Sequence, residues 1–232
     1  MTLVVLIRHA HSSANGSGIL AGRTEGVQLS PIGRKQANEL ARRLGAIPIK
    51  SLRSSPQERC EQTISPWIRK ISQVDPKIRV EIDPDLSEVD YGEWTGRKLR
   101  ALSKEDLWKK IQDRPSQVVF PKGEGLAAMQ ERAMRAVHRG LSKRGKGHVI
   151  LVSHGDVLKS IIAASLNMHL DEFQRIVVDP ASISILDYSS AKPRLILMND
   201  SKSALTPELF QDRRAQLLVG GGAGTQTTRR KP

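Results

Sequence analysis

The sequence of 232 residues has a single cysteine, few aromatic side chains and no long apolar run. One cysteine, Cys60, cannot build a disulfide framework, which excludes a disulfide-stabilised secreted scaffold and favours a reducing compartment. No apolar run reaches the roughly 18 residues that a membrane span needs. Residues 1–8 lack the basic start and the small-residue cleavage site of a secretory signal peptide. We therefore expect a cytoplasmic protein that neither crosses a membrane nor is anchored in one.

The scarcity of aromatic side chains bears on the large positive charge. Aromatic residues make up 3% of the chain, and its formal net charge is +13. Such a charge favours nucleic acid, an acidic surface or anionic small molecules such as phosphate esters as partners. Proteins that bind single-stranded nucleic acid place aromatic stacking platforms beside their Lys and Arg residues. Nucleic acid is therefore the weaker prediction, and a small phosphorylated substrate is the stronger one.

The last segment of the chain has a composition of its own. Residues 212–232 hold five basic residues and one acidic residue, together with a glycine-rich run at 219–224. This run has no periodicity, and its burial would gain too little to offset the entropy of ordering it. We predict a flexible basic tail over 212–232 that follows a single domain over 1–211.

The rest of the sequence alternates apolar segments typical of strands with amphipathic segments typical of helices. Strands are predicted near 3–7, 49–52, 78–82, 148–152, 182–186 and 194–198. Helices are predicted from Ser30-Pro31 to Gly45, from the capping-box sequence Ser55-Pro56-Gln57-Glu58 onward, over 126–141, and from Gly155 onward. An insertion over 92–125 should carry one more helix, near 98–112, and should cover the functional site. This order predicts a three-layer α/β/α sandwich with a mainly parallel central sheet.

Polar residues directly follow two of the predicted buried strands. Arg8 and His9 come after the first strand, and His154 follows the strand that ends at Val152. Ligands of open α/β sheets bind beyond the carboxyl ends of the strands, so both histidines should face the same edge. A phosphoryl-transfer site needs a nucleophile and fixed positive charge on the phosphoryl oxygens. Arg8 and Arg59 suit the second role, because a guanidinium binds phosphate bidentately and keeps its charge.

Several short motifs occur in an order that is typical of one family. They are Arg8-His9-Ala10 with Ser12 and Asn15 downstream, Leu29-Ser30-Pro31-Ile32-Gly33-Arg34-Lys35-Gln36-Ala37, Ser54-Ser55-Pro56-Gln57-Glu58-Arg59-Cys60-Glu61-Gln62-Thr63, Leu86-Ser87-Glu88 with Tyr91-Gly92-Glu93-Trp94-Thr95-Gly96, Gly123-Glu124, and Val152-Ser153-His154-Gly155. Over about residues 1–200 the chain thus resembles the histidine phosphatase superfamily, in its phosphoglycerate mutase-like branch. One motif alone would be unspecific, whereas the ordered set is specific.

The resemblance implies a role for each matching residue. His9 would be the nucleophile that becomes phosphohistidine, and Glu88 would donate the proton to the leaving group. Because His9 must attack as neutral imidazole, its other ring nitrogen should donate to a backbone carbonyl. The residues implied to bind the phosphate are Arg8, Arg59, His154, Ser12 and Asn15. The expected activity is that of a phosphomonoesterase acting on a small phosphorylated metabolite, with no cofactor and no metal.

Three positions depart from the family pattern. Ala10 stands where glycine usually follows the nucleophile, and its methyl group should crowd the backbone near the phosphate. His11 stands where an acidic or amide residue is common, and Gly125 replaces a serine. None of the three removes a catalytic group. We therefore still expect activity, with rate and substrate choice as the properties that these positions would change.

Three alternative functions stay open on the sequence alone. His9 and His11, with His154 and Asp156, could form a zinc hydrolase site, although such a site leaves the arginines unused. A non-catalytic module that binds phosphate or RNA would account for the basic charge. A phosphomutase would pass the phosphoryl group to a bound sugar acid instead of water. We find no proline-rich, tyrosine-containing insertion of the cofactor-dependent phosphoglycerate mutases, which favours the phosphatase.

Overall fold

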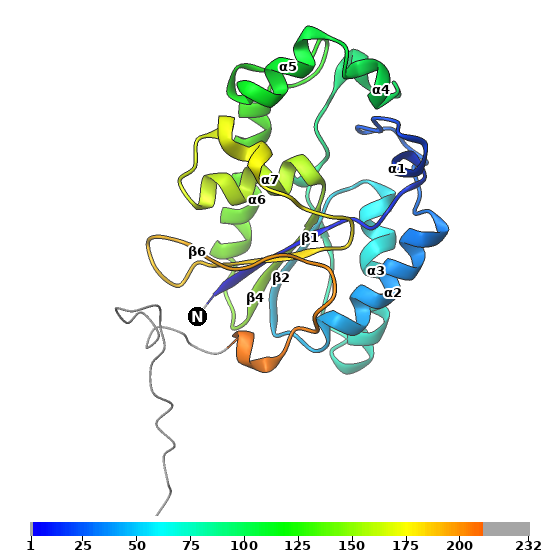
Figure 1. The fold of residues 1–232 in the computed structure, drawn as a ribbon. Coiled ribbons are helices and arrows are strands. Elements are labelled where there is room, and N and C mark those ends of the chain that lie inside the picture. The colour runs from blue at the N-terminus through cyan, green and yellow to red at the C-terminus, as the bar shows by residue number, and fades with distance from the viewer. Residues whose placement is uncertain (1, 211–232) are drawn as a thin grey trace, which may run out of the picture.

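A computed structural model describes residues 2–210 of the chain. Its centre is a six-stranded sheet in the order β3-β2-β4-β1-β5-β6 (Figure 1). The strands are β1 (Leu3–Arg8), β2 (Ile49–Ser54), β3 (Glu81–Ile82), β4 (His148–Ser153), β5 (Ile183–Asp187) and β6 (Arg194–Asp200). The first four of the series pair in parallel, and β5 and β6 complete the sheet in antiparallel pairs. The predicted mainly parallel sheet is confirmed.

Strand β1 shows why the sheet is buried on both faces. Its side chains alternate, so that Leu3, Val5 and Ile7 join one apolar cluster while Val4 and Leu6 join another. A strand that is apolar at every position must be covered from both sides. The helices α2 (Pro31–Leu44) and α3 (Glu58–Val74) cover the first face, and α6 (Leu126–Ser142) and α7 (Gly155–Ser165) cover the second. The predicted three-layer α/β/α sandwich is confirmed.

The ends of helix α2 lie where the sequence predicts them. The Ser30 hydroxyl accepts a hydrogen bond from the Gly33 amide, Pro31 is the first helical residue, and Gly45 follows the last one. Helix α3 differs from the prediction. It begins at Glu58 after Gln57 and has no side-chain cap, so the capping box predicted at Ser55 is wrong. The physical reason is tertiary, because the Ser55 hydroxyl lies 2.7 Å from Nε2 of His154 and bonds to that ring instead.

The insertion over 92–125 holds two short helices in place of the single helix predicted near 98–112. These are α4 (Leu99–Leu102) and α5 (Asp106–Asp113). Leu102 and Ile111 both enter the same apolar cluster. In one straight helix nine residues make two and a half turns, which would place the two side chains on opposite faces. The break between α4 and α5 therefore lets both side chains be buried.

The insertion lies above the carboxyl ends of the central strands (Figure 1). The rings of Trp94 and Trp108 stack there with centroids 6.4 Å apart, and Phe120 meets Trp94 edge-on at 5.6 Å. Helix α1 (Ser13–Ser17) lies at the same end of the molecule. Short 3-10 helices cover Pro84–Leu86, Gly92–Trp94, Pro115–Gln117, Leu170–Arg175 and Pro207–Phe210. This aromatic cluster packs the segments of the insertion against one another.

Two further predictions have definite outcomes. The strand predicted over 78–82 shrinks to β3, because only Glu81 and Ile82 pair with β2 at this edge of the sheet. Among the described residues, no helix is both long and apolar enough to cross a membrane. The predicted tail over 212–232 lies outside the described residues.

Candidate active site

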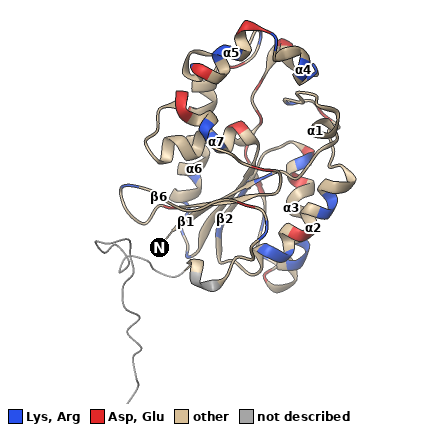
Figure 2. Cartoon of the chain, in the orientation of Figure 1, with Lys and Arg blue, Asp and Glu red and all other residues tan. Residues whose placement is uncertain are grey.

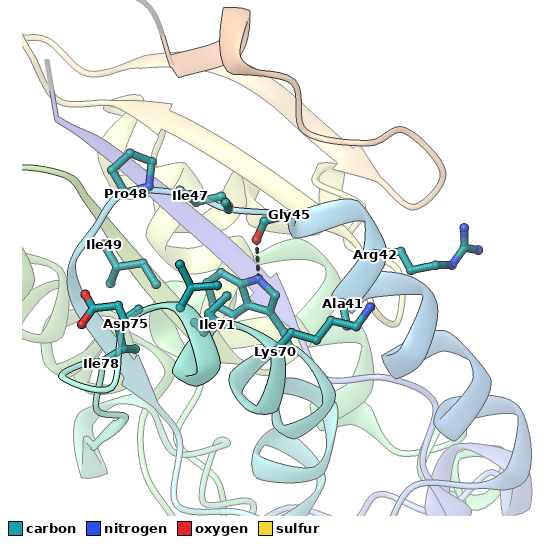
Figure 3. Close-up of a pocket in the computed structure, with 13 residues that line it drawn as sticks. Ala41, Arg42, Gly45, Ile47, Pro48, Ile49, Lys70, Ile71, Asp75 and Ile78 are labelled. Atoms are coloured by element: carbon teal, nitrogen blue, oxygen red, sulfur yellow. Dashed lines mark hydrogen bonds between the residues drawn. The ribbon is translucent and has the colours of Figure 1, made fainter.

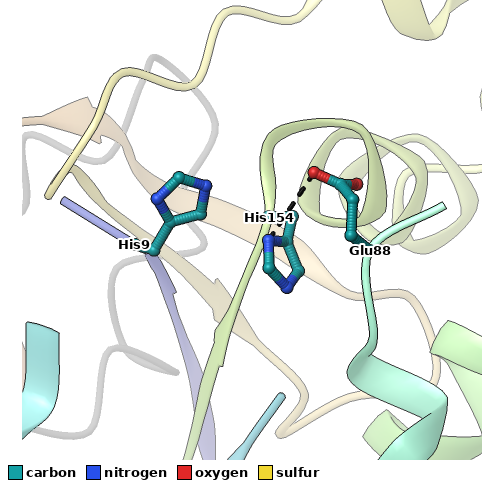
Figure 4. Close-up of side chains that lie close together, drawn as sticks. All are labelled: His9, Glu88 and His154. Carbon is teal, nitrogen blue, oxygen red and sulfur yellow. Dashed lines mark ion pairs between the residues drawn. The ribbon is translucent and has the colours of Figure 1, made fainter. Parts of the chain in front are cut away.

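The two histidines predicted at the strand ends lie side by side. Strands β1 and β4 pair in parallel with Arg8 opposite Ser153, and the His9 amide donates to the Ser153 carbonyl at 2.9 Å. Each histidine follows its strand by one residue, and the ring centroids are 5.1 Å apart with an interplanar angle of 58°. Figure 4 shows both rings with Glu88 beside them. The parallel register thus brings together residues that are 145 positions apart in the sequence.

His9 has the protonation pattern of a nucleophile. Its Nδ1 lies 2.8 Å from the Ala10 carbonyl oxygen. A carbonyl can only accept, so Nδ1 carries the proton and Nε2 keeps a free lone pair. Burial, together with the charges of Arg59 and Arg8, holds the pKa of His9 well below its usual value. The ring is therefore neutral and fixed in the tautomer that phosphoryl transfer requires.

The arginines beside His9 carry buried donors that lack partners. Arg8 donates from Nη1 to the Val178 carbonyl at 2.6 Å, and Arg59 donates from Nη2 to the Gly22 carbonyl at 2.8 Å. Nε of Arg8 and Nη1 of Arg59 are buried without a hydrogen-bond partner in the described part of the chain. An unsatisfied buried donor on a cation is costly. An anion with several oxygens, such as a phosphoryl group, would satisfy both.

His154 is a neutral ring held from both sides. Its Nε2 lies 2.7 Å from the Ser55 hydroxyl and 3.1 Å from Oε1 of Gln57, and its Nδ1 accepts from Nη2 of Arg59 at 3.1 Å. Burial and the charge of Arg59 hold the pKa of His154 well below its usual value. On the side of Arg59 the neutral ring therefore presents an acceptor. It becomes a donor there only once an anion draws a proton onto Nδ1.

Glu88 is a carboxyl group with a raised pKa. It follows the 3-10 helix Pro84–Leu86, and its Oε1 accepts from the Val89 amide at 3.0 Å. Its Oε2 lies 3.6 Å from Nδ1 of His154 (Figure 4). Burial first, and the negative charge of Asp156 second, raise the pKa of Glu88 to about 7, although Arg59 opposes them. Both partners of this contact thus favour their uncharged forms, so it is not a strong ion pair.

Ser12 and Asn15 contact each other. The Ser12 hydroxyl caps helix α1 by accepting from the Asn15 amide, and Oδ1 of Asn15 accepts from the Ser12 amide and hydroxyl. This reciprocal cap uses the oxygen of each side chain. The phosphate contacts expected of these two residues remain a prediction.

Two of the three departures from the family pattern, Ala10 and His11, are accommodated away from the reacting groups. The Ala10 methyl is fully buried in a small cluster with Leu29, Ala37 and Ala181, so it packs into the core and does not crowd the phosphate side. Nδ1 of His11 lies 2.8 Å from the Ser30 hydroxyl at the start of α2. His11 thus supports the helix end and has no described contact with His9.

Two residues that the sequence did not single out, Arg23 and Arg132, hold Glu88 in place together with Glu124. Arg132 donates to the carbonyls of Ser87 and Glu88 and binds both oxygens of Glu124. Arg23 donates to the Glu88 carbonyl at 2.9 Å and to Glu124 at 3.0 Å. The Gly123-Glu124 motif was a signal for this network, but sequence alone did not reveal its partners, which come from separate segments.

A metal is a poor fit to this cluster. One ligand atom from each of His9, Glu88 and His154 falls within 4.8 Å of the others, a spacing that a metal ion could bridge. However, Nη2 of Arg59 already occupies the lone pair of His154 Nδ1, and Arg8 adds a second positive charge. The zinc site that would include His11 does not form, because the His11 side chain bonds to Ser30. The donor set is that of an anion site.

A pocket of about 630 Å³ lies away from this cluster, between α2, α3 and the start of β2 (Figure 3). Its wall is largely apolar, and Nε1 of Trp67 donates to the Gly45 carbonyl at 2.8 Å in its side. None of the predicted site residues lines it. The predicted site at the carboxyl edge of the sheet is therefore separate from this pocket.

Comparison with known proteins identifies the family. "Phosphoserine phosphatase 1" of Hydrogenobacter thermophilus is 26% identical over 203 residues, covering 86% of this chain and 92% of the relative. "Probable phosphoglycerate mutase GpmB" of Proteus mirabilis is 28% identical over 193 residues, covering 82% and 87%. A crystal structure of the alpha-ribazole phosphatase from Shigella flexneri superposes with a TM-score of 0.76 at 25% identity, covering 88% of this chain and 100% of that one.

Residues 4–201 match the model of the histidine phosphatase superfamily (branch 1). This range includes both strand-end histidines, the two arginines and Glu88. The resemblance inferred from the motifs is confirmed, and the chain belongs to the histidine phosphatase superfamily.

Proposed function

We propose that this protein is a metal-independent phosphomonoesterase that acts on a small phosphorylated metabolite through a phosphohistidine at His9. One observation carries the proposal above the rest. The free Nε2 of His9 lies in a site with two buried guanidinium donors, Nε of Arg8 and Nη1 of Arg59, that find no partner among the described residues. A nucleophile next to unsatisfied cationic donors is what transfer of a phosphoryl group requires.

In the first step, the lone pair on Nε2 of His9 forms a bond to phosphorus and the ester P–O bond breaks. The electron pair of that bond goes to the leaving oxygen, which takes a proton from the Glu88 carboxyl. Arg8 and Arg59 stabilise the charge on the phosphoryl oxygens, and His154 joins them once the anion draws a proton onto its Nδ1. The pKa of Glu88, raised to about 7, makes the proton available near neutral pH.

In the second step, water attacks the phosphorus of phosphohistidine, and the Glu88 carboxylate accepts one of its protons. The P–N bond breaks, its electron pair returns to Nε2 of His9, and inorganic phosphate leaves. Each turnover restores the neutral imidazole and the protonated carboxyl. Glu88 donates a proton in the first step and accepts one in the second, so the two steps need the same groups.

The relatives support a phosphatase and keep a mutase as the alternative. Their names include a phosphoserine phosphatase, an adenosylcobalamin/alpha-ribazole phosphatase and a probable phosphoglycerate mutase. The two activities differ only in whether water or a bound sugar acid receives the phosphoryl group from His9. We favour water, because the sequence has no counterpart of the insertion that we expect of a cofactor-dependent mutase.

A non-catalytic module for RNA or phosphate is less well supported. Figure 2 shows acidic residues beside basic ones on α2 and α5, so the charge on these helices is mixed. Arg42 on α2, for example, pairs with Glu39 one turn away. RNA binding would predict steep salt dependence and no effect of His9→Ala.

We further propose that residues 1–211 act as one domain in the cytoplasm, with the insertion over 92–125 selecting the substrate. Two apolar clusters on opposite faces of one sheet support the single domain. The one cysteine, Cys60, is buried and forms no disulfide, which supports a reducing compartment such as the cytoplasm. In support of the role in substrate choice, helices α4 and α5 of the insertion lie beyond the carboxyl ends of the central strands (Figure 1).

The deciding experiment measures inorganic phosphate released from a panel of phosphomonoesters, including phosphoserine and 3-phosphoglycerate, with a chelator present. The wild type should turn over at least one ester, and His9→Ala should not. Formation of 2-phosphoglycerate from 3-phosphoglycerate without phosphate release would establish the mutase instead. If wild type and His9→Ala are equally inert, the catalytic proposal fails and RNA binding becomes the remaining candidate.

A further inference from the structure

The Glu88 backbone is held by two cations from different parts of the chain. Nε of Arg23 donates to the Glu88 carbonyl at 2.9 Å, and Nη2 of Arg132 donates to the same oxygen at 3.1 Å. Oε1 of Glu124 then accepts from both guanidinium groups, from Arg23 at 3.0 Å and from Arg132 at 2.6 Å. The four groups form a closed ring of hydrogen bonds with Glu88 as one member.

The two cations differ in how strongly they are built into the fold. Arg132 is buried on α6, and its Nη1 also donates to the carbonyls of Asp85 and Ser87. The side chain of Arg23 is 40% exposed and belongs to the loop between α1 and α2. Arg132 therefore anchors the segment before Glu88 to the core, while Arg23 closes over it from outside.

Arg23 also connects the two halves of the site. The preceding residue, Gly22, accepts a hydrogen bond from Nη2 of Arg59, which belongs to the phosphate-binding half. One dipeptide thus touches the phosphate-binding guanidinium through its first residue and the proton-donor segment through its second. A shift of either half would strain the other through this short connection.

We propose that Arg23, with Glu124 and Arg132, is a clasp that positions the Glu88 carboxyl against the leaving group of the substrate. The proposal rests on the proposed function of Glu88 as proton donor. Arg23 is a positioning residue here, because it acts through the Glu88 backbone. A general acid contributes only when its proton lies within hydrogen-bonding reach of the leaving atom, so a small displacement is costly.

The test compares two esters that differ in their need for a proton. The leaving group of p-nitrophenyl phosphate is a weak base and departs without protonation, whereas the alkoxide of glycerol 2-phosphate needs a proton. For both esters kcat/KM reports the transfer to His9, in which the leaving group departs. Arg23→Met should lower kcat/KM about 10-fold for the alkyl ester and less than about 2-fold for the aryl ester.

Three further variants calibrate this result. Glu88→Gln should show the same selectivity with a larger loss on the alkyl ester, of about 100-fold or more. Arg23→Lys can make only one of the two contacts and should fall between wild type and Arg23→Met. Arg42→Met is the matched control, since Arg42 is an exposed arginine of α2, outside the insertion, that pairs with Glu39, and it should leave both esters unchanged.

Amide hydrogen exchange gives a readout that does not depend on turnover. The Asp90 amide donates to Oε1 of Glu124 at 2.8 Å, inside the clasp. Its exchange should accelerate in Arg23→Met and not in Arg42→Met. Equal losses on the two esters, or unchanged Asp90 exchange, would overturn the clasp. If the wild type releases no phosphate from these two esters or from the panel above, the phosphatase proposal fails instead, and Asp90 exchange still decides whether Arg23 holds this segment.

Discussion

Oε2 of Glu88 lies 3.6 Å from Nδ1 of His154, and burial favours the uncharged form of both groups. A carboxyl beside an imidazole normally transfers its proton to the ring and forms an ion pair. Arg59 opposes that transfer, because its Nη2 lies 3.1 Å from the same Nδ1 and its charge disfavours imidazolium. The proton therefore stays on Glu88, where a leaving group can take it.

The first prediction concerns His9. Replacing it with alanine removes the only group whose lone pair we assign to attack phosphorus, and phosphate release should fall by at least about 1,000-fold. His138→Ala is the control, since His138 is an exposed histidine on α6. A His9→Ala protein that keeps its circular dichroism spectrum and its activity would refute the phosphohistidine mechanism.

The second prediction is a pH profile. Because the pKa of Glu88 is raised to about 7, kcat/KM for an alkyl phosphate should fall above that pH as Glu88 loses its proton. The charge of Asp156 contributes to this raised pKa, so Asp156→Asn should move the basic limb to lower pH. Tyr91, which donates to Asp156, can also donate to the asparagine oxygen, so the local structure should persist. A limb that does not move would remove Asp156 from this role.

The third prediction links Glu88 to stability. The folded state holds its pKa near 7, above the usual value of 4.5, so folding is opposed whenever the unfolded chain would ionise this group. The contribution of protonated Glu88 to the free energy of unfolding is fully present below pH 4.5 and is lost as the pH rises through 7. Glu88→Gln removes this loss, and at pH 8 it should raise the free energy of unfolding by about 2 kcal/mol.

Urea denaturation at pH 4 and at pH 8 checks this prediction. The gain from Glu88→Gln should be present at pH 8 and nearly absent at pH 4. Glu93→Gln, at an exposed glutamate of the 3-10 helix Gly92–Trp94, is the control and should show no such difference. An equal effect at both pH values would show that the raised pKa of Glu88 is not the cause.

The fourth prediction concerns Ser55. Its hydroxyl lies 2.7 Å from Nε2 of His154, which also has Oε1 of Gln57 within 3.1 Å as a second partner. Because one partner remains, Ser55→Ala should reduce kcat/KM only about 3- to 10-fold. Ser65→Ala is the matched control, since its hydroxyl bonds to the Glu61 carbonyl within α3. An unchanged rate in Ser55→Ala would mean that Gln57 alone orients the ring.

The fifth prediction separates the cost of backbone strain from the cost of steric contact at two glycines. Gly22 has a φ of +53°, and a Cβ there would lie 3.0 Å from Oγ1 of Thr95 and 3.2 Å from Cδ2 of Tyr91. Gly26 has a φ of +72° in open space. Gly26→Ala should therefore cost about 1 kcal/mol from backbone strain alone, and Gly22→Ala about 2–3 kcal/mol.

Thermal unfolding measures both costs. Gly22→Ala should also weaken binding of inorganic phosphate, because the Gly22 carbonyl holds Nη2 of Arg59. Gly26→Ala should not affect that binding. Equal losses of stability in the two variants would mean that the loop around Gly22 moves to admit a methyl group.

Local patterns of the sequence determined the ends of α2, the burial of β1 and β4, and the family of this protein. The boundaries of α2 follow from Ser30, Pro31 and Gly45, which act on their own neighbours in the chain. The apolar runs of β1 and β4 placed His9 and His154 at the edge of one parallel sheet, because an uninterrupted apolar strand must lie in its interior. The motif order gave the family, which the comparison confirms.

The tertiary structure decided what depends on distant partners. Ser55 was predicted to cap a helix, yet it bonds to a ring 99 positions away, and Arg23 meets Glu124 across 101 positions. The break between α4 and α5 exists because Leu102 and Ile111 must reach the same core. Periodicity and capping rules describe neighbours within a few residues, whereas these contacts depend on which segments the fold brings together. The sequence by itself therefore specified the sheet and its histidines, and the packed structure alone determined the groups that orient them.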